Sequence, residues 1–231
     1  MGLLGSFLMT KLDLTNVTMV SVNCVDPIQS AKALLYSSRD IDFAEMILIS
    51  NKKPDNLPKS IRFVETEQTT HQEGSLHSYK TLPDLIETDY YLGIHDDGFI
   101  INPNLWQNEF FEYDYIGAPW KDEGQRNRVG NGGFVFKSKK FIELCRYIKH
   151  LGRHDDGELT NDYYDYFTAN GCKYAPVEVA MRFSLESKIP ECEYNLDNCF
   201  GFHGRGVVDA VHDGEGQQFK DRIKLLEQVK I

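Results

Sequence analysis

The chain has 231 residues, of which 41% are hydrophobic and 26% are charged, a balance typical of a soluble globular protein with a sizeable core. Its formal net charge of −10 at pH 7 argues against nonspecific binding to nucleic acid or to anionic membranes, because both need basic patches. The same negative charge is compatible with a nucleotide bound through a metal ion, since the ion makes the local charge positive.

The cysteines and the apolar runs indicate which cellular compartment the protein occupies. The cysteines are odd in number and form no C-x-x-C pair, which argues against a zinc site or a disulfide framework and favours a reducing compartment. No apolar run approaches the ~18 residues of a membrane span, so we expect no transmembrane segment. The apolar residues 1–9 lack the basic start and the cleavage site of a secretory signal. We therefore expect a cytoplasmic protein with a flexible N-terminal segment over residues 1–14.

In chain order, the first half alternates strands with helices. Residues 18–25 are predicted to form a buried strand, and Asp26 and Pro27 then begin a helix that ends near Ser38. Further strands are predicted over residues 45–50, 61–64 and 90–94, with a helix over 75–87. This alternation predicts a mostly parallel sheet. The absence of G-x-G-x-x-G and of a Walker loop disfavours dinucleotide and P-loop binding.

The second half is less regular. A glycine-rich turn over residues 130–133 leads into a strand, and no linker or repeat interrupts the chain. The sequence therefore predicts one domain over residues 15–231. The other predicted elements are helices over 104–112, 139–151, 160–169 and 215–230, and strands over 113–116, 178–184 and 199–203.

The strand predicted over residues 90–94 runs directly into His95, Asp96 and Asp97. An apolar strand that ends in charged residues leaves the core there, and in an open α/β sheet this edge is where ligands bind. Carboxylate oxygens at such an edge can hold a divalent cation, and the cation can hold phosphates. The alternative is a solvated turn, because Asp-Asp-Gly is common in turns.

The same tetrapeptide occurs a second time, at residues 154–157. No apolar strand precedes this copy, only Leu151, Gly152 and Arg153. We therefore interpret the second copy as a surface loop, in contrast to the first.

Four other features each have a structural and a functional interpretation. The glycines of residues 130–133 allow either a hairpin turn or a close approach of the backbone to a ligand. Asp162, at the start of a predicted helix, is either a helix cap or a general base. His203 ends an apolar strand and is either a metal ligand or an ordinary hydrogen-bonding residue. Trp120 is either a core residue or a platform for a sugar ring.

Together these features resemble the glycosyltransferases of the GT-A type, and more closely a glycosyltransferase-like family of bacteria, fungi and viruses. That family has a strand ending in Asp-Gly-Phe, then Tyr-Asp-Tyr-Ile-Gly-Ala-Pro-Trp, then Gly-Asn-Gly-Gly-Phe. This chain has the same motifs at residues 97–99, 113–120 and 130–134, in the same order and at similar spacing. The resemblance covers residues 17–205 and implies an α/β protein of the GT-A fold, with a single Rossmann-like mixed sheet flanked by helices.

The resemblance also implies roles for individual residues. Asp97 matches the metal-binding aspartate of the Asp-x-Asp motif, His95 stands in place of its first aspartate, and His203 matches a late histidine of the metal site. Asp162 matches the catalytic base, although Asn161 departs from the acid that many relatives have before it. The other matched residues contact the nucleotide donor (Asn23, Asp26, Lys80, His95 and Asp96) or the acceptor (Trp120, Asn131, Gly132 and Gly133).

The activity that this resemblance implies is that of a hexosyl- or deoxyhexosyltransferase dependent on Mn²⁺ or Mg²⁺. Such an enzyme moves a sugar from a UDP- or GDP-type donor to a hydroxyl of a glycan or other acceptor, here with inversion and Asp162 as the base. The charged residues 121–128 would close over the donor and exclude water. The alternatives are a sugar-nucleotide nucleotidyltransferase, which normally has a glycine-rich loop after the first strand, a metal-dependent phosphohydrolase, and a catalytically silent sugar-binding module.

Overall fold

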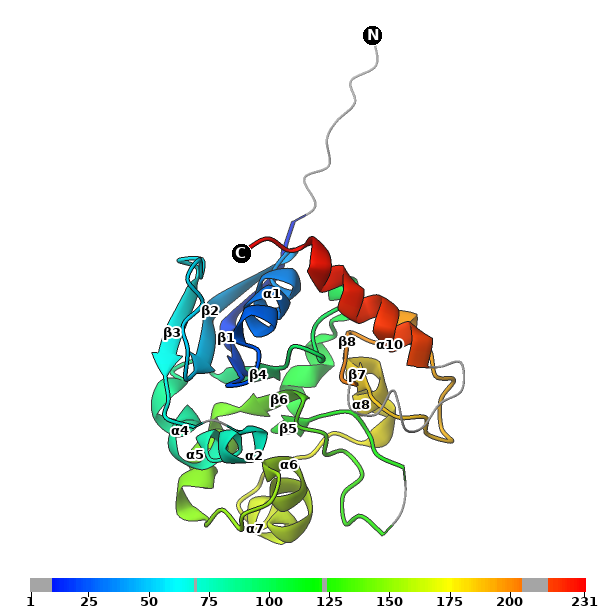
Figure 1. The fold of residues 1–231 in the computed structure, drawn as a ribbon. Helices are drawn as coiled ribbons and strands as arrows, with labels where there is room; N and C mark the ends of the chain where they lie inside the picture. The colour runs from blue at the N-terminus through cyan, green and yellow to red at the C-terminus, as the bar shows by residue number, and fades with distance from the viewer. Residues whose placement is uncertain (1–9, 69, 122–123, 205–215) are drawn as a thin grey trace.

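The computed structural model describes residues 10–68, 70–121, 124–204 and 216–231, and Figure 1 shows its fold. Within these ranges, six strands form one mixed sheet and two short strands form a separate pair. The strands are β1 (Leu12–Val22), β2 (Ile41–Ser50), β3 (Ile61–Glu65), β4 (Tyr90–Ile94), β5 (Tyr115–Ile116), β6 (Phe134–Ser138), β7 (Ser184–Leu185) and β8 (Gly201–Phe202).

Most of the helices between these strands are short. The α-helices are α1 (Pro27–Ser37), α2 (His71–Gly74), α3 (His77–Lys80), α4 (Leu82–Leu85), α5 (Lys139–Leu144), α6 (Asp155–Gly157), α7 (Tyr164–Ala169), α8 (Val177–Phe183) and α10 (Gly216–Ile223). A π-helical turn over Glu158–Asp162 joins α6 to α7. The 3₁₀ turns cover Pro103–Leu105, Asn108–Glu112, Cys145–Tyr147, Leu196–Asn198 and Lys224–Gln228.

The strand order of the large sheet is β3-β2-β1-β4-β6-β5. Strands β3, β2, β1 and β4 run parallel to one another, whereas β6 is antiparallel to both β4 and β5. The chain therefore moves outward from β1 in one direction through β2 and β3 and then returns to add β4 on the other side of β1. This reversal between β1 and β4 is the switch point where open α/β sheets bind their ligands.

Helices cover both faces of the sheet, and each face has its own hydrophobic core (Figure 1). One core packs α1, α8 and α10 against residues of β1 and β4 such as Met19 and Leu92. The other core packs α4, α5 and α7 against the opposite face, through residues such as Val20 and Tyr91. Adjacent strand residues thus point to opposite cores, as the period of two in a strand requires. The predicted α/β architecture, a mixed sheet flanked by helices, is confirmed.

Several predicted secondary-structure elements need correction. The strand predicted over residues 178–184 is mostly the helix α8, in which Val179, Ala180 and Phe183 are buried on one side. A short apolar run fits a strand or a buried helix equally well by periodicity, and here Pro176 precedes the helix as its cap. The helix predicted over 75–87 divides into α3 and α4, and that over 139–151 ends as a 3₁₀ turn at Tyr147.

The segment expected to be flexible, residues 1–14, lies largely outside the described residues. Its last three residues, beginning with Leu12, already belong to β1, and Leu14 is fully buried. β1 therefore begins earlier than the sequence indicates. Among the described helices, none has the length and apolar character that a membrane span requires.

Candidate active site

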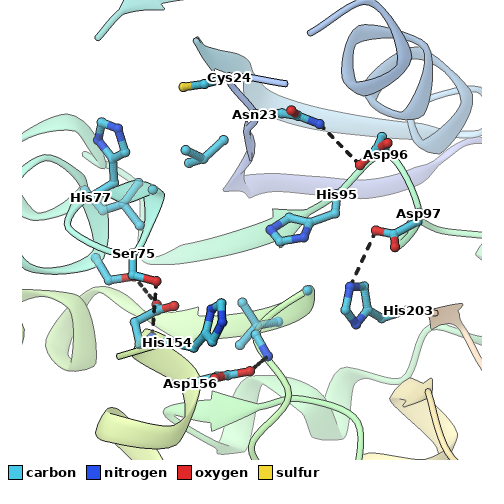
Figure 2. A pocket seen from close by; sticks show the side chains of 18 of the residues that line it. Asn23, Cys24, Ser75, His77, His95, Asp96, Asp97, His154, Asp156 and His203 are labelled. Carbon is cyan, nitrogen blue, oxygen red and sulfur yellow. Dashed lines mark hydrogen bonds and ion pairs between the residues drawn. The ribbon is translucent and has the colours of Figure 1, made fainter. Parts of the chain in front are cut away.

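A cavity of about 550 Å³ opens where β1 and β4 end, at the switch point of the sheet. Figure 2 shows its lining side chains, which come from segments far apart in the sequence. The residues after β1 and after β4 form one side, and the glycine loop before β6 and the start of α6 form another. The lining residues fall within 22–26, 70–78, 95–97, 132–137 and 154–156, together with Leu82, Tyr91 and His203.

His95, Asp97 and His203 form a group that could hold a metal ion, because their ligand atoms lie within 4.8 Å of one another. His95 and Gly98 form a tight bridge after β4, with the N–H of His95 donating to the carbonyl oxygen of Gly98 at 2.8 Å. Asp97 lies inside that turn, and its carbonyl oxygen accepts a hydrogen bond from the N–H of Gly204. The turn after β4 is thereby joined to the end of β8, which brings His203 beside Asp97.

Glu186 contacts His203 on the opposite side of the imidazole ring from Asp97. Leu185 of β7 pairs with Phe202 of β8, so the residues that follow them, Glu186 and His203, are neighbours. Nδ1 of His203 lies 3.0 Å from Oε1 of Glu186, and its Nε2 lies 3.5 Å from Oδ1 of Asp97. A carboxylate on the far nitrogen of a histidine is the arrangement that orients histidine ligands of metals.

The electrostatics of His203 also fit a cation site. Burial alone would lower its pKa, but hydrogen bonds and charges of Asp97 and Glu186 outweigh burial and raise the pKa to about 10. Without a metal, a proton on His203 thus balances the two carboxylates. A divalent cation bound between His203 and Asp97 would take over that role, since it also offsets carboxylate charge. Two imidazoles and one carboxylate suit Mn²⁺ better than Mg²⁺, which prefers oxygen ligands.

Asp96 and Asn23 have a different role from Asp97, because they connect the ends of β1 and β4. The amide nitrogen of Asn23 donates to Asp96 at 3.2 Å and to Ser30 at 2.9 Å. The side-chain oxygen of Asn23 accepts the N–H groups of Val25 and Asp26, both at 2.8 Å. Asn23 and Asp96 line the cavity while they fix its backbone.

Asp26 also lines the cavity, and its contact with a donor stays a prediction. Its carboxylate caps α1 and accepts the N–H of Gln29 at 3.0 Å, so the predicted helix cap is confirmed.

The second His-Asp-Asp-Gly copy does not lie on plain surface, and the interpretation of it as a surface loop is wrong. His154, Asp155 and Asp156 all line the cavity. Figure 2 shows His154 and Asp156 on the side opposite Asn23. Two serines near α3 hold this copy in place: the Asp155 carboxylate accepts the hydroxyl of Ser78, and the hydroxyl of Ser75 accepts the N–H of Asp155. These contacts join residues about 80 positions apart, so no local pattern reveals them.

Buried Glu158 holds the same loop from its other end. Its carboxylate accepts the N–H groups of Leu151 and Arg153 at 2.9 and 2.8 Å and the hydroxyl of Tyr79 at 2.7 Å. Glu158 begins the π-helical turn, a rare geometry that is frequent at functional sites. The repeated tetrapeptide was the one sequence signal that could have pointed to this loop.

Asp156 is the carboxylate in this loop that is best placed for chemistry. One of its oxygens accepts the N–H of Gly132 at 3.2 Å, and the other accepts the N–H of Gly157 at 2.7 Å. Burial and the neighbouring charge of Asp155 raise the pKa of Asp156, although these two hydrogen bonds act against the rise. A raised pKa makes an ionised carboxylate a stronger proton acceptor.

Gly132 and Gly133 lie between Asp156 and the metal-binding group. A Cβ at Gly132 would lie 3.0 Å from Cβ of Asp156, and a Cβ at Gly133 would lie 2.1 Å from Nε2 of His203. Since consecutive Cα atoms are about 3.8 Å apart, this pair holds Asp156 and His203 close to each other across one cavity wall. Gly133 requires glycine for space, and a Cβ at Gly132 would press against Asp156. The approach of this loop to a ligand stays a prediction.

Gly133→Ala is expected to lower the affinity for Mn²⁺ by about tenfold or more, because the added Cβ forces the His203 ring out of its position. Calorimetric titration of the purified protein with Mn²⁺ measures this. Gly157→Ala is the matched control, since a Cβ there meets no atom within 4 Å. Equal Mn²⁺ affinities for the two variants would contradict this description of the site.

The structure does not bring four of the sequence-predicted residues into the cavity. Lys80 is exposed at the end of α3. Trp120 packs against Gly130, and Asn131 is buried behind the glycine loop, where its side-chain oxygen accepts the N–H of Gly133 at 3.0 Å. Trp120 and Asn131 therefore support the cavity wall from behind rather than line it.

Asp162 is the fourth predicted site residue that lies outside the cavity. It lines a separate hollow of about 300 Å³, and its carboxylate is paired with Arg153 at 2.5 Å. This hollow shares His154 with the cavity, so the two are adjacent. The position of Asp162 gives no support to its predicted role as a base, which stays a prediction from the sequence.

Lys137 and His77 are cavity residues that sequence reasoning missed. Lys137, near the end of β6, is almost fully buried, and its ammonium lies 3.6 Å from Asp155. A lysine inside an apolar strand is a signal that the sequence did offer. His77 lies in α3 and had no distinguishing local pattern.

The chain has a match among protein families but none among curated proteins. A protein-family model described as "Protein of unknown function (DUF5672)" matches residues 55–203. None of the curated proteins matches the chain.

Two solved structures resemble the fold. The structure of galactosyltransferase LgtC with donor and acceptor sugar analogues has a TM-score of 0.52 and 12% sequence identity, and the match covers 92% of this chain and 97% of that one. The bifunctional IspDF of Campylobacter jejuni has a TM-score of 0.47 and 12% identity, over 69% of this chain. The chain spans about half of the length of that bifunctional protein, 48%.

Proposed function

This chain belongs to the family described as Protein of unknown function (DUF5672), and we propose that it is a metal-dependent glycosyltransferase that uses a nucleotide-sugar donor. Over nearly its whole length it shares a fold with a galactosyltransferase, LgtC. Fold alone does not decide an activity, so the support for this proposal comes from the residues of the site.

One observation carries the proposal. A group suited to a divalent cation (His95, Asp97 and His203) and a separate carboxylate with a raised pKa (Asp156) face the same cavity on either side of two glycines. Glycosyl transfer from a sugar nucleotide needs charge neutralisation at the diphosphate and proton removal from the acceptor. The two groups match these two needs.

The donor is proposed to lie along the edge of β1 and β4. Its diphosphate would be held beside Asp97 and His203, and its nucleoside would lie along residues 23–26, where Asn23 and Asp96 fix the backbone. Mn²⁺ or Mg²⁺, when bound, would offset the charge on the departing UDP- or GDP-type leaving group. Lys137 adds the positive charge of a buried ammonium to the same cavity.

Asp156 is proposed as the base in place of Asp162. Its carboxylate removes the proton from the acceptor hydroxyl as the oxygen of that hydroxyl forms a bond to the anomeric carbon. The bond from that carbon to the phosphate oxygen breaks in the same step, and the electron pair leaves with the nucleoside diphosphate. A single displacement of this kind inverts the anomeric configuration.

The acceptor is proposed to enter from the side of α6. Gly132 and Gly133 form that wall, with Trp120 and Asn131 behind them. The adjoining hollow, lined by polar residues such as Asn161 and Asp162, extends the cavity in this direction and suits the hydroxyls of a glycan. This gives Asp162 a proposed role in acceptor binding.

A thermal-shift screen of nucleoside diphosphates and their sugars, with and without Mn²⁺, tests the proposal. The cognate compound is expected to raise the unfolding temperature on the order of 5–10 °C at 100 times its Kd, and only with the metal present. Release of nucleoside diphosphate from the cognate sugar nucleotide then separates a transferase from a silent sugar-binding module. If none of these compounds raises the unfolding temperature, the proposal is wrong.

A further inference from the structure

Lys137 is a buried lysine in the lining of the cavity, and its ammonium makes no hydrogen bond to the described residues. Its side chain is 3% exposed, and its ion-pair partner is Asp155, whose Oδ2 lies 3.6 Å from Nζ. An ammonium carries three donors, and a buried polar group that makes no hydrogen bond is costly. Nζ is not among the unpartnered atoms that the described residues seal from solvent, so it opens into the cavity that Lys137 lines.

The hydroxyl of Tyr91 is a second polar group of this kind. Tyr91 is 6% exposed and lines the cavity. Its hydroxyl has no hydrogen-bond partner in the part of the chain that the structure describes, and it too is not sealed from solvent. A Cβ at Gly93 would collide with this hydroxyl, so the ring lies along β4 in the direction of His95. Burial and the charge of Asp155 raise the pKa of Tyr91, so the hydroxyl keeps its proton and can donate or accept.

The sheet places these two groups side by side. Lys137 pairs with Tyr91 across β6 and β4, and with Tyr115 across β6 and β5. Residues directly opposite each other on neighbouring strands share a face of the sheet, so the three side chains point to the same side. The ammonium lies 5.8 and 5.5 Å from the ring centroids of Tyr91 and Tyr115, within range of the cation–π attraction of both rings. The rings hold the ammonium in place without occupying its hydrogen-bond donors.

Asp155 adds an acceptor beside these donors. Its Oδ2 accepts the hydroxyl of Ser78 and lies near Lys137, which leaves Oδ1 without a hydrogen-bond partner among the described residues. The charges of the ammonium and of this carboxylate cancel, and Asp156 adds a further carboxylate to the same cavity, so an anion would meet more negative than positive charge. Uncharged hydroxyls suit the set, because one can donate to the carboxylate while its neighbour accepts from the ammonium. We call Tyr91, Lys137 and Asp155 the Lys137 group.

The Lys137 group lies deeper in the sheet than the proposed metal-binding group. β6 begins with Phe134, at the edge of the sheet where His95 follows β4, and Lys137 lies three residues further along the strand. At ~3.3 Å per residue, this places Lys137 about 10 Å from that edge. A donor whose diphosphate is bound at the edge would present its next group, the sugar, to the Lys137 group. Asp155 directly precedes Asp156, so a sugar bound here would also lie beside the proposed base.

We propose that the Lys137 group binds neighbouring hydroxyls of an uncharged sugar, the one that the donor carries. This inference rests on the proposed use of a nucleotide-sugar donor and adds the residues that recognise its sugar. The metal-binding group holds the diphosphate, which all such donors share. The Lys137 group selects the donors whose sugar presents two free hydroxyls on adjacent carbons.

Calorimetric titration of the full chain with Mn²⁺ and UDP, GDP, UDP-glucose, UDP-galactose or GDP-mannose tests this. In the native chain, the sugar nucleotide that binds best is expected to bind more tightly than its nucleoside diphosphate. Tyr91→Phe removes only the hydroxyl and is expected to weaken that sugar nucleotide about fivefold. Lys137→Met is expected to weaken it about tenfold or more, since hydrogen bonds from charged groups are stronger. The affinity for UDP or GDP alone is expected to stay unchanged in both variants.

Each variant has a matched control outside the cavity. Tyr90→Phe removes a hydroxyl from the neighbouring residue of β4, which packs against the other core and donates to the carbonyl oxygen of Phe111. Lys140→Met removes an ammonium at an exposed position. Both controls are expected to bind all five compounds as the native chain does. Thermal unfolding checks that every variant is folded, and Tyr91→Phe is expected to be as stable as the native chain, because the hydroxyl it removes makes no hydrogen bond to the described residues.

The outcomes separate this inference from the proposed function. If Tyr91→Phe and Lys137→Met weaken UDP or GDP as much as the sugar nucleotides, these groups act on the diphosphate or on the fold, and the inference is wrong while the proposed function stands. Native affinity for the sugar nucleotides in both variants would overturn the inference in the same way. If the native chain binds none of the five compounds, the proposed function fails as well.

Discussion

Asp97→Ala is expected to abolish metal-dependent binding of nucleoside diphosphates, with a loss of at least about 100-fold. Removing even an outer-shell partner of a metal ligand costs about 10- to 100-fold in metal affinity, and a direct carboxylate ligand matters more. In this chain Asp97 is the only carboxylate in the group with His95 and His203, as far as the described residues go. Its loss leaves two imidazoles and no negative ligand for the cation.

Calorimetry with Mn²⁺ alone, and then with Mn²⁺ and the cognate nucleoside diphosphate, measures this effect. Asp42→Ala is the matched control, because it removes one negative charge at an exposed position of β2, where Asp42 pairs with Lys11. Near-native Mn²⁺ affinity in Asp97→Ala would mean that the cation is held elsewhere, and the proposed donor site would then be wrong.

Asp156→Asn is expected to retain donor binding and to lose about 10²- to 10⁴-fold in turnover, the range typical for removal of a general base. The amide keeps the shape of the carboxylate and can still accept the N–H of Gly132, which the carboxylate accepts at 3.2 Å. It cannot take a proton. Metal-dependent hydrolysis of the cognate sugar nucleotide, in which water replaces the acceptor, gives the rate without knowledge of the acceptor.

Asp162→Asn decides between the two candidate bases. The substitution makes the same chemical change in the adjoining hollow, where the carboxylate is paired with Arg153. We expect near-native donor hydrolysis in Asp162→Asn. A large loss of turnover in Asp162→Asn, together with an active Asp156→Asn, would restore the assignment that the sequence resemblance implies.

The strands of the sheet and one side of the site could be predicted from local patterns in the chain. Strand β4 and the second half of β1 are mostly apolar and buried, which is typical of strands that helices cover on both faces of a sheet. The end of the apolar run at Ile94 located the turn with Asp97, because charge cannot stay in the core. The cap at Asp26 was equally local, since the carboxylate contacts a backbone N–H three residues away.

The groups that face that turn depend on contacts between segments far apart in the chain. The second His-Asp-Asp-Gly copy has the same letters as the first, but its place depends on Ser75 and Ser78, held there by hydrogen bonds across about 80 residues. Glu186 reaches His203 because β7 pairs with β8, and the two residues lie 17 positions apart.

Local patterns and long-range contacts differ in how they are encoded in the chain. A helix cap joins residues that are close in the chain, and burial selects apolar residues at regular spacing. Both therefore leave a pattern that the sequence shows. The meeting of Asp156, Gly132 and Gly133 with His203 depends on how separate segments pack, and packing energy is shared among many distant residues. No single stretch of sequence carries that information, which is why the sequence did not predict that Asp156 lines the cavity.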